Sequence, residues 1–312
     1  MYNFFKIWAR LALFFYSRKT VANFALILNL NQPKILASNH PNSFFDAIVI
    51  AVHYPKPIYF LARGDAFNKP LIKKFLNALH LIPIYRLSEG KENLSKNDST
   101  FERCLKLLKS NEHILIFPEG VCVNEWNLRS LKKGTARLAF MALHQKINNL
   151  IVQPINLNYS SFYKVPKEII INFNEPITVS NLSNHAENVF YRIFNQELKE
   201  GITRKMLIKS DLQYFDLFPK KENYLRKILL FIPAILGFIS QYWIYFFLKK
   251  WVIKKTKNSV FYDSVLFGLL MFSYPVIIIV MATFVGIFFN FKLGLSMLIL
   301  LPFTAWCCKE IK

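Results

Sequence analysis

Cysteine and acidic residues are both scarce in this chain of 312 residues. There are four Cys residues, and only 19 Asp and Glu stand against 40 Lys and Arg. The cysteines form no paired C-x-x-C motifs and stand beside no well-spaced histidines, so the sequence contains no readable zinc site and we expect no metal. Scattered thiols are typical of a reducing compartment, and Cys307 and Cys308 fit ordinary membrane cysteines better than palmitoylation sites.

The shortage of acids leaves a formal net charge of +21 at pH 7. Such an excess fits either nucleic acid or an anionic membrane surface with phosphorylated substrates. Hydrophobic residues make up 53% of the chain, and the C-terminal third is its most apolar part, which favours the membrane. Aromatic residues fall mainly in the same apolar runs rather than between basic residues, so we expect no nucleic-acid partner.

The chain shows no internal repeat and no low-complexity linker, and its pattern divides it into three segments. Residues 1–30 are expected to form an amphipathic membrane-interface helix and its lead-in, residues 31–215 a folded domain, and residues 216–312 a membrane region. A cleaved signal peptide is the rival interpretation of residues 1–17. Its apolar run is short, Arg18 and Lys19 follow at once, and no small-residue cleavage site is evident.

The middle segment alternates short apolar runs with longer amphipathic stretches, which predicts an α/β fold with a mostly parallel sheet and flanking helices. The expected strands are Lys34–Ser38, Pro57–Ala62, Leu81–Tyr85, His113–Phe117, Ile151–Tyr159 and Glu168–Phe173. The expected helices are Asp46–His53, Asn68–Leu79, Ser99–Ser110 and Gly134–His144, the third capped by Asp98 or Ser99.

The C-terminal segment contains three apolar stretches. Val265–Phe289 is long enough to cross a bilayer, and Leu293–Cys308 would return, giving a helical hairpin over residues 265–308. Ile228–Leu248 is interrupted at Pro233 and Gly237, so we expect it to re-enter the membrane rather than span it. That arrangement leaves both the basic folded domain and the lysine-rich loop that follows on the cytoplasmic side.

One motif with chemical potential is the Ser38–Asp46 segment, which follows a predicted strand and leads into a predicted helix. A histidine on such a turn is accessible to substrate, and a nearby carboxylate can hold one of its ring nitrogens. The other nitrogen of His40 is then free to take a proton from a hydroxyl, as in the His–Asp half of a catalytic triad. Taken alone, a loop histidine beside a helix N-terminal aspartate explains Asn39-His40 and Asp46 better.

A second motif, Phe117-Pro118-Glu119-Gly120, follows another predicted strand. Gly120 allows a tight backbone turn, and Glu119 could orient acceptor hydroxyls or a cationic group. An ordinary strand-ending turn explains this motif equally well when it is considered by itself.

In their order and separation, the two motifs together resemble the glycerolipid acyltransferase family, the lysophosphatidic acid and glycerol-3-phosphate acyltransferases. That family combines an NH-x4-D box, an arginine after a short strand, an F-P-E-G box and an apolar strand that ends in proline. The matching residues are Asn39-His40 with Asp46, Leu81–Arg86, Phe117–Gly120 and Val152–Ile155, with Lys133-Gly134 and Arg137 resembling the family's K-G-x-x-R stretch. The resemblance covers about residues 30–180.

The sequence departs from the family pattern in two places. Five residues, not four, separate His40 from Asp46, a spacing that resembles the branch of fungal glycerol-3-phosphate acyltransferases. Val121 and Cys122 follow the F-P-E-G box where the family often has Thr-Arg-Ser. The family's basic residue near this box would then be Arg129, Lys132 or Lys133.

The resemblance implies a direct transfer without a covalent enzyme intermediate, in which His40 is the general base and Asp46 orients it. Arg86 would hold the acceptor phosphate. The other residues that the resemblance implies for substrate binding are Asn39, Phe117, Pro118, Glu119, Gly120 and Lys133. It implies no cofactor; acyl-CoA or acyl carrier protein would donate the acyl chain to glycerol 3-phosphate or 1-acylglycerol 3-phosphate.

We therefore expect an integral membrane protein in contact with membrane lipids, with its catalytic domain facing the cytoplasm. A catalytically inactive scaffold of the same fold and an acyltransferase for another lysolipid are the alternatives, although the presence of both His40 and Asp46 argues against lost catalysis. A transporter fits less well, because no apolar segment carries a central acid or base and Asp263 lies at a segment edge where solvation is cheap.

Overall fold

A computed structural model describes residues 1–24, 29–85, 96–207, 216–219, 224–257 and 259–311. The chain divides into two compact units, which are described separately. The sheet unit comprises Met1–Lys6, Val21–Asn158 and Ile170–Asp211, and the helical unit comprises Ile7–Thr20, Tyr159–Ile169 and Leu212–Lys312. The predicted boundaries after residues 30 and 215 stay predictions.

The strands form one eight-stranded sheet. They are β1 (Ser17–Phe24), β2 (Lys34–Ser38), β3 (Tyr59–Arg63), β4 (Leu81–Ile84), β5 (His113–Ile116), β6 (Ile151–Tyr159), β7 (Lys167–Phe173) and β8 (Ile177–Thr178). Their order is β1-β7-β6-β2-β5-β3-β4, with β8 paired antiparallel to β6. Strand β2 pairs in parallel with β5 and β6, and β3 pairs in parallel with β4 and β5. The predicted mostly parallel α/β sheet is confirmed.

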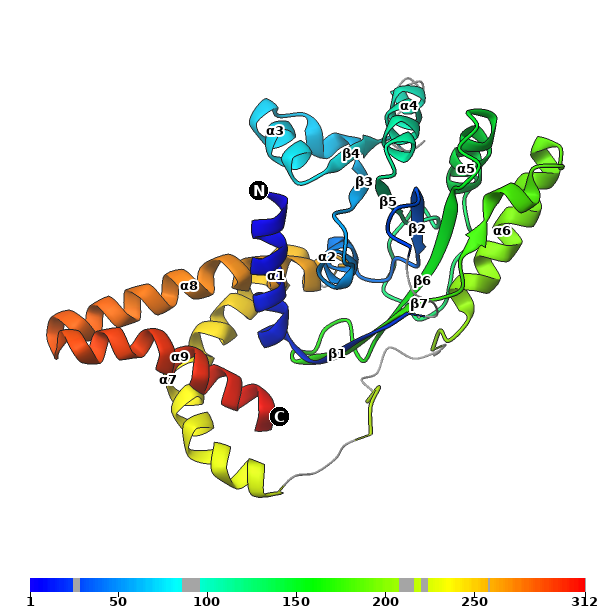
Figure 1. Cartoon of the computed structure of the whole chain (residues 1–312). Coiled ribbons are helices and arrows are strands. Elements are labelled where there is room, and N and C mark those ends of the chain that lie inside the picture. The colour runs from blue at the N-terminus through cyan, green and yellow to red at the C-terminus, as the bar shows by residue number, and fades with distance from the viewer. Residues whose placement is uncertain (25–28, 86–95, 208–215, 220–223, 258, 312) are drawn as a thin grey trace. The chain divides into compact units, whose positions relative to one another are not determined.

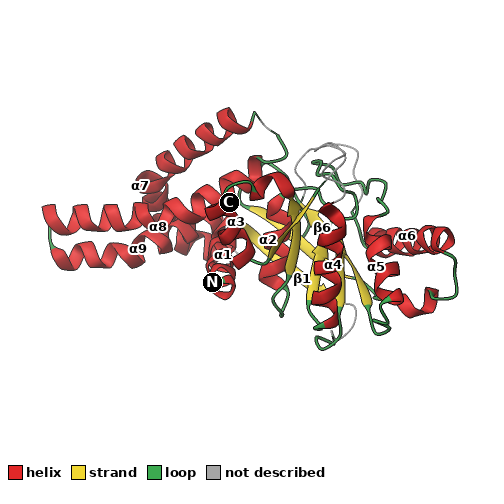
Figure 2. Cartoon of the chain, turned by 90° about the horizontal axis from the view of Figure 1, so that it is seen from above, coloured by secondary structure: helices red, strands yellow, loops and turns green. Residues whose placement is uncertain are grey.

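Helices flank this sheet in the sheet unit (Figures 1 and 2). They are α2 (Phe44–His53), α3 (Pro70–Ala78), α4 (Lys96–Lys109), α5 (Gly134–His144) and α6 (Glu187–Thr203), with short 3-10 turns at Gly64–Phe67 and Val179–Leu182. Helix α1 (Tyr2–Tyr16) begins in the sheet unit and continues in the helical unit. Its position at a membrane interface stays a prediction.

The hydrophobic core explains why β2 and β5 lie in the middle of the sheet. Every residue of both strands is buried, as expected for strands that are covered on both faces. Leu105 of α4, Leu138 of α5 and Phe194 of α6 pack into the same cluster as Ile35 and Ile114 of these strands. Burial of this continuous apolar core is the main favourable contribution to folding of the sheet unit.

Three elements were absent from the sequence-based expectation. Strand β1 reads SRKTVANF, which has no apolar run, and β8 has only two residues. Helix α6 did carry a signal, since its buried residues Phe190, Phe194, Leu198 and Ile202 recur every four positions.

Helix α4 begins three residues before the predicted start, so Asp98 lies in its first turn and does not cap it.

Three long helices dominate the helical unit: α7 (Tyr224–Thr256), α8 (Tyr262–Phe288) and α9 (Phe291–Ile311). Each is long and apolar enough to cross a membrane. The expected interruption at Pro233 and Gly237 is wrong, because α7 continues through both residues. Gly237 is a close-packing residue, since a Cβ there would lie 2.5 Å from the Thr304 carbonyl oxygen of α9. Whether α7 spans the membrane or re-enters stays a prediction.

Asp263, expected at a solvated segment edge, is buried instead. It stands in the first turn of α8 and is only 1% exposed. The ammonium of Lys167, itself fully buried at the start of β7, lies 2.5 Å from one Asp263 oxygen, and the Tyr16 hydroxyl donates to the other. Burial of the carboxylate is possible because a cation and a hydroxyl replace its hydration shell.

A buried histidine makes the sheet unit sensitive to acid. His113 begins β5; its Nε2 lies 3.0 Å from the Gln32 carbonyl oxygen and its Nδ1 lies 2.9 Å from the Tyr54 hydroxyl. Burial, reinforced by the positive charge of Lys56, lowers the pKa of His113 to about 4. Because the unfolded value is about 6.5, the neutral form is favoured in the fold, and its stabilising effect is lost as the pH falls from about 6.5 toward 4.

We therefore expect the unfolding midpoint to fall less between pH 7 and pH 4 in the His113→Gln variant than in the wild type. The Gln side chain can still accept from Tyr54 and donate to Gln32 but takes up no proton. Thermal unfolding in detergent at a series of pH values measures the difference. The exposed His185 supplies the control, His185→Gln, and an equal acid sensitivity of all three proteins would contradict the prediction.

Candidate active site

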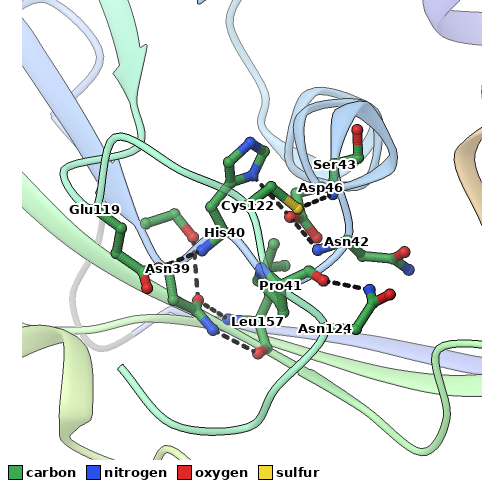
Figure 3. Close-up of polar contacts among 11 residues, drawn as sticks. Asn39, His40, Pro41, Asn42, Ser43, Asp46, Glu119, Cys122, Asn124 and Leu157 are labelled. Carbon is green, nitrogen blue, oxygen red and sulfur yellow. Dashed lines mark hydrogen bonds and ion pairs between the residues drawn. The ribbon is translucent and has the colours of Figure 1, made fainter. Parts of the chain in front are cut away.

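The two motifs singled out in the sequence meet at one edge of the sheet. Strands β2 and β5 are parallel neighbours, with Ala37 opposite Ile116. The chain leaves both strands in the same direction, so the loops that follow, residues 39–43 and 117–120, lie side by side (Figure 3). The carboxyl edge of a parallel sheet is where α/β proteins usually bind their ligands.

His40 and Asp46 form the central pair of this site. The Nδ1 atom of His40 lies 2.9 Å from Oδ2 of Asp46, and the same oxygen accepts a 2.7 Å bond from the Asn42 backbone N–H. Asp46 is fully buried in the first turn of α2, where the helix dipole favours a negative charge. The carboxylate can only accept, so Nδ1 carries the proton of this bond.

The second ring nitrogen of His40 remains available for chemistry. The His40 side chain is 13% exposed, and among the residues that the structure describes none hydrogen-bonds to Nε2. With Nδ1 protonated, Nε2 carries the lone pair that can take a proton from a hydroxyl. The pair therefore has the geometry of a general base with its orienting carboxylate.

Glu119 connects the two loops. Its Oε1 accepts a 2.7 Å bond from the His40 backbone N–H, and its Oε2 accepts a 3.0 Å bond from the Arg129 backbone N–H. The residue is 4% exposed, and burial raises its pKa while these two bonds act in the opposite direction. Both oxygens are thus committed to the backbone, which gives Glu119 the role of positioning His40. Direct contact of Glu119 with an acceptor stays a prediction.

Phe117 packs against the His40 ring, and Gly120 forms the turn that follows Phe117. The Phe117 ring stacks on the imidazole with centroids 3.9 Å apart and planes 13° from parallel, which restricts the ring's rotation. Gly120 has a positive φ of 70° and its N–H donates to the Phe117 carbonyl. The carbonyl of Pro118 accepts a 2.7 Å bond from the Lys132 N–H, which holds the following segment against this turn.

Asn39 is fixed to the sheet. Its side-chain oxygen accepts a 2.8 Å bond from the Leu157 N–H, and its side-chain nitrogen donates a 3.1 Å bond to the Leu157 carbonyl. The amide thus continues the pairing of β2 with β6 beyond the Ser38–Ile155 pair. Asn39 is 2% exposed and sets the start of the His40 loop, and its contact with substrate stays a prediction.

Two residues near the site were missed by the sequence reasoning. The Ser43 backbone N–H donates to Cys122 Sγ at 2.9 Å, and Asn124 Nδ2 donates to the Pro41 carbonyl at 2.7 Å. Both bonds brace the loop between His40 and Asp46 (Figure 3). The departure from the family pattern after Gly120 was the available signal, since Cys122 and Asn124 stand in that segment.

The residues predicted to bind the acceptor phosphate do not form a described cluster beside His40. Arg86 lies outside the described residues. Lys133 is exposed and immediately precedes α5, and the Arg129 side chain pairs with Glu125 at 2.9 Å. Within the described ranges no cluster of three or more His, Cys, Asp or Glu residues could hold a metal ion.

Comparison with known proteins relates the part of the chain that contains this site to a known family. Residues 17–158 match the family model described as Acyltransferase. The chain is 25% identical over 134 residues to the chloroplastic 1-acyl-sn-glycerol-3-phosphate acyltransferase LPAT1 of Arabidopsis thaliana, covering 43% of this chain and 36% of that protein. It is 30% identical over 108 residues to the 1-acyl-sn-glycerol-3-phosphate acyltransferase of Bacillus subtilis, covering 34% and 49%.

The chain thus spans between about a third and a half of the length of these curated relatives. Among solved structures, the 1-acyl-sn-glycerophosphate acyltransferase PlsC of Thermotoga maritima aligns with a TM-score of 0.46 and 15% identity, covering 67% of this chain and 81% of that one. The resemblance to the acyltransferase family is confirmed over residues 17–158, whereas the fungal branch stays a prediction.

The turn at Gly120 offers a direct test of the local backbone. We expect Gly120→Ala to lower the free energy of unfolding by about 1 kcal/mol, because a residue with a Cβ is strained at φ 70°. Gly134→Ala is the matched control, since Gly134 is the first residue of α5 and a Cβ there meets nothing within 4 Å. Denaturant unfolding compares the two, and equal stability would contradict the assignment.

Proposed function

We propose that this protein is a membrane-bound acyltransferase that moves a fatty acyl chain from a thioester donor to a hydroxyl of a phosphorylated glycerol acceptor. The observation that carries the proposal is the His40–Asp46 pair, with Nδ1 held by the carboxylate at 2.9 Å and Nε2 open. It lies within residues 17–158, the part of the chain that matches the acyltransferase family.

In the proposed reaction, Nε2 of His40 removes the proton of the acceptor hydroxyl as its oxygen attacks the thioester carbonyl. The carbon–sulfur bond then breaks, the new ester is released, and the leaving thiolate takes the proton back from the imidazolium. Asp46 stabilises the imidazolium while it exists, and Glu119 and Phe117 keep the ring in place. No covalent link to the protein forms.

The two backbone N–H groups nearest the site in sequence already have hydrogen-bond acceptors, so they are poor candidates for stabilising the developing oxyanion. The backbone N–H groups of His40 and Gly120 are the nearest candidates in sequence. The first donates to Glu119 and the second to the Phe117 carbonyl, so both are occupied. The oxyanion would therefore need another donor, such as a basic side chain from the segment after Gly120.

The proposed acceptor is glycerol 3-phosphate or 1-acylglycerol 3-phosphate, and the proposed donor is acyl-CoA or acyl carrier protein. Arg86 would hold the acceptor phosphate, assisted by Lys133. The net charge of +21 would attract both phosphorylated substrates and anionic headgroups. Three apolar helices support a protein embedded in the membrane, and we propose that the active site faces the cytoplasm.

Replacing the proposed base tests the mechanism. We expect His40→Ala and Asp46→Asn to lower kcat at least 100-fold, since general-base catalysis contributes about 10²–10⁴-fold. Labelled acyl-CoA or acyl carrier protein is incubated with each acceptor, and the labelled product lipid is counted. The variant of an exposed histidine, His185→Ala, should retain wild-type activity. Full activity of His40→Ala would overturn the role of His40, and no activity of the wild type with either donor would favour an inactive scaffold or another lysolipid.

The bracing contact at Cys122 predicts a second pattern. Cys122→Ala removes the partner of the Ser43 N–H and should lower kcat about tenfold with little change in KM, because a small displacement of His40 misplaces the base. Cys122→Ser keeps an acceptor atom and should restore most of the activity. If the two variants were equally active, the contact would have no catalytic importance.

A further inference from the structure

A cavity of about 530 Å³ lies inside the helical unit. Its walls come from α1, α7, α8 and α9 and from Val165 and Pro166 between β6 and β7, and every lining residue belongs to this unit. The volume falls in the range of about 300–1,000 Å³ that is usual for small-molecule sites. The proposed acyl-transfer chemistry makes no use of this cavity.

Two polar side chains of its wall, Gln241 and Tyr274, already have hydrogen-bond partners. The Tyr274 hydroxyl donates to Gln241 Oε1 at 2.7 Å, and Gln241 Nε2 donates to Thr304 Oγ1 and to the Leu301 carbonyl, each at 3.0 Å. A polar ligand would have to displace these bonds, whereas an apolar ligand leaves them intact. The wall therefore favours a hydrocarbon occupant.

Pro275 explains a further polar contact in the wall. A proline has no N–H, so the Met271 carbonyl four residues earlier in α8 loses its helical partner. Trp8 of α1 supplies the replacement, since its Nε1–H donates to the Met271 carbonyl at 3.2 Å. All three residues line the cavity, and the carbonyl that would otherwise be costly in an apolar environment is satisfied.

The cavity opens among outward-facing apolar side chains. Leu11, Phe238 and Ile279 line it and are 53%, 51% and 59% exposed. Phe238 stands on α7 and Ile279 on α8, and both of these helices are long and apolar enough to cross a membrane. In a bilayer this rim would meet lipid tails, so the hydrocarbon that can reach the cavity is an acyl chain.

A positive charge marks one part of the wall. Of the described lining residues, Lys309 is the only charged one; its ammonium donates to the Phe14 carbonyl at 2.6 Å and lies 3.6 Å from Glu310. Glu310 also pairs with Arg226 at 2.8 Å. Two cations, Lys309 and Arg226, thus stand against one acid, which suits the phosphate of an anionic headgroup.

We propose that this cavity binds one acyl chain of an anionic phospholipid, with the phosphate at the end marked by Arg226 and Lys309. The inference depends on the helical unit lying in a bilayer and is independent of the proposed acyl transfer. It assigns α1 and α7–α9 a lipid-binding role beyond that of an anchor.

Photolabelling of the full chain in nanodiscs tests the proposal. The probe is phosphatidylglycerol with a diazirine on one acyl chain, in a phosphatidylcholine carrier, and mass spectrometry locates the label. We expect label on cavity-lining residues of α1 and α8. Leu270→Trp, which fills the cavity, should reduce that label about tenfold, equivalent to about 1.4 kcal/mol. Leu295→Trp makes the same change on an exposed α9 position outside the lining and should have no effect.

The headgroup is tested separately. Lys309→Gln keeps a donor for the Phe14 carbonyl but removes the charge, and should bring labelling by phosphatidylglycerol down to that by a matched phosphatidylcholine probe. Equal label on lining and outward-facing residues, or insensitivity to Leu270→Trp, would reduce the site to ordinary annular lipid and overturn the proposal. Thermal unfolding checks that each variant is folded, and Ala12→Phe replaces Leu270→Trp if the latter is not.

Discussion

The buried carboxylate of Glu119 is the constraint on which the site depends. It has two oxygens and gives each to a backbone N–H, one at His40 and one at Arg129. The strands that precede these loops are parallel neighbours whose register is fixed by the core, so the carboxylate joins elements that are already aligned. Removing the carboxylate from water costs free energy, and the two hydrogen bonds offset part of that cost. Because Glu119 holds His40 through its backbone N–H, the imidazole ring takes no part in this contact.

The buried pair Lys167–Asp263 of the helical unit is also stabilised by its partners, but these leave no group of the pair exposed. Lys167 and Asp263 neutralise each other where neither meets water, and the Tyr16 hydroxyl completes the shell of the carboxylate. Removing either Lys167 or Asp263 would leave an uncompensated buried charge, so loss of one partner is expected to be strongly destabilising. His40 differs because only one of its nitrogens is held.

The sequence allowed β2 and β6 to be predicted to the residue, because each contains several apolar residues and alternates with longer amphipathic stretches along the chain. It did not allow β1 to be predicted, since a polar strand at the sheet edge resembles a loop, nor the burial of Asp263, whose cation is 96 residues away. In the site, residue types and order predicted the His40–Asp46 pair. The bonds of Glu119 and Cys122 to backbone N–H groups have no sequence signature, because every residue except proline supplies a backbone N–H.

The five-residue spacer shows how the fold absorbs a departure from the family pattern. An extra residue inside α2 would rotate Asp46 by about 100° around the helix axis and turn it away from His40. The structure places the irregularity before the helix, at Ser43, whose φ of 53° lies in the left-handed region. Asp46 therefore stays in the first turn, where it reaches both His40 and the Asn42 N–H. Left-handed backbone is costly for serine, and the bond of its N–H to Cys122 helps to offset that cost. The longer spacer and the unusual segment after Gly120 are thus joined by one contact, the bond between the Ser43 N–H and Cys122.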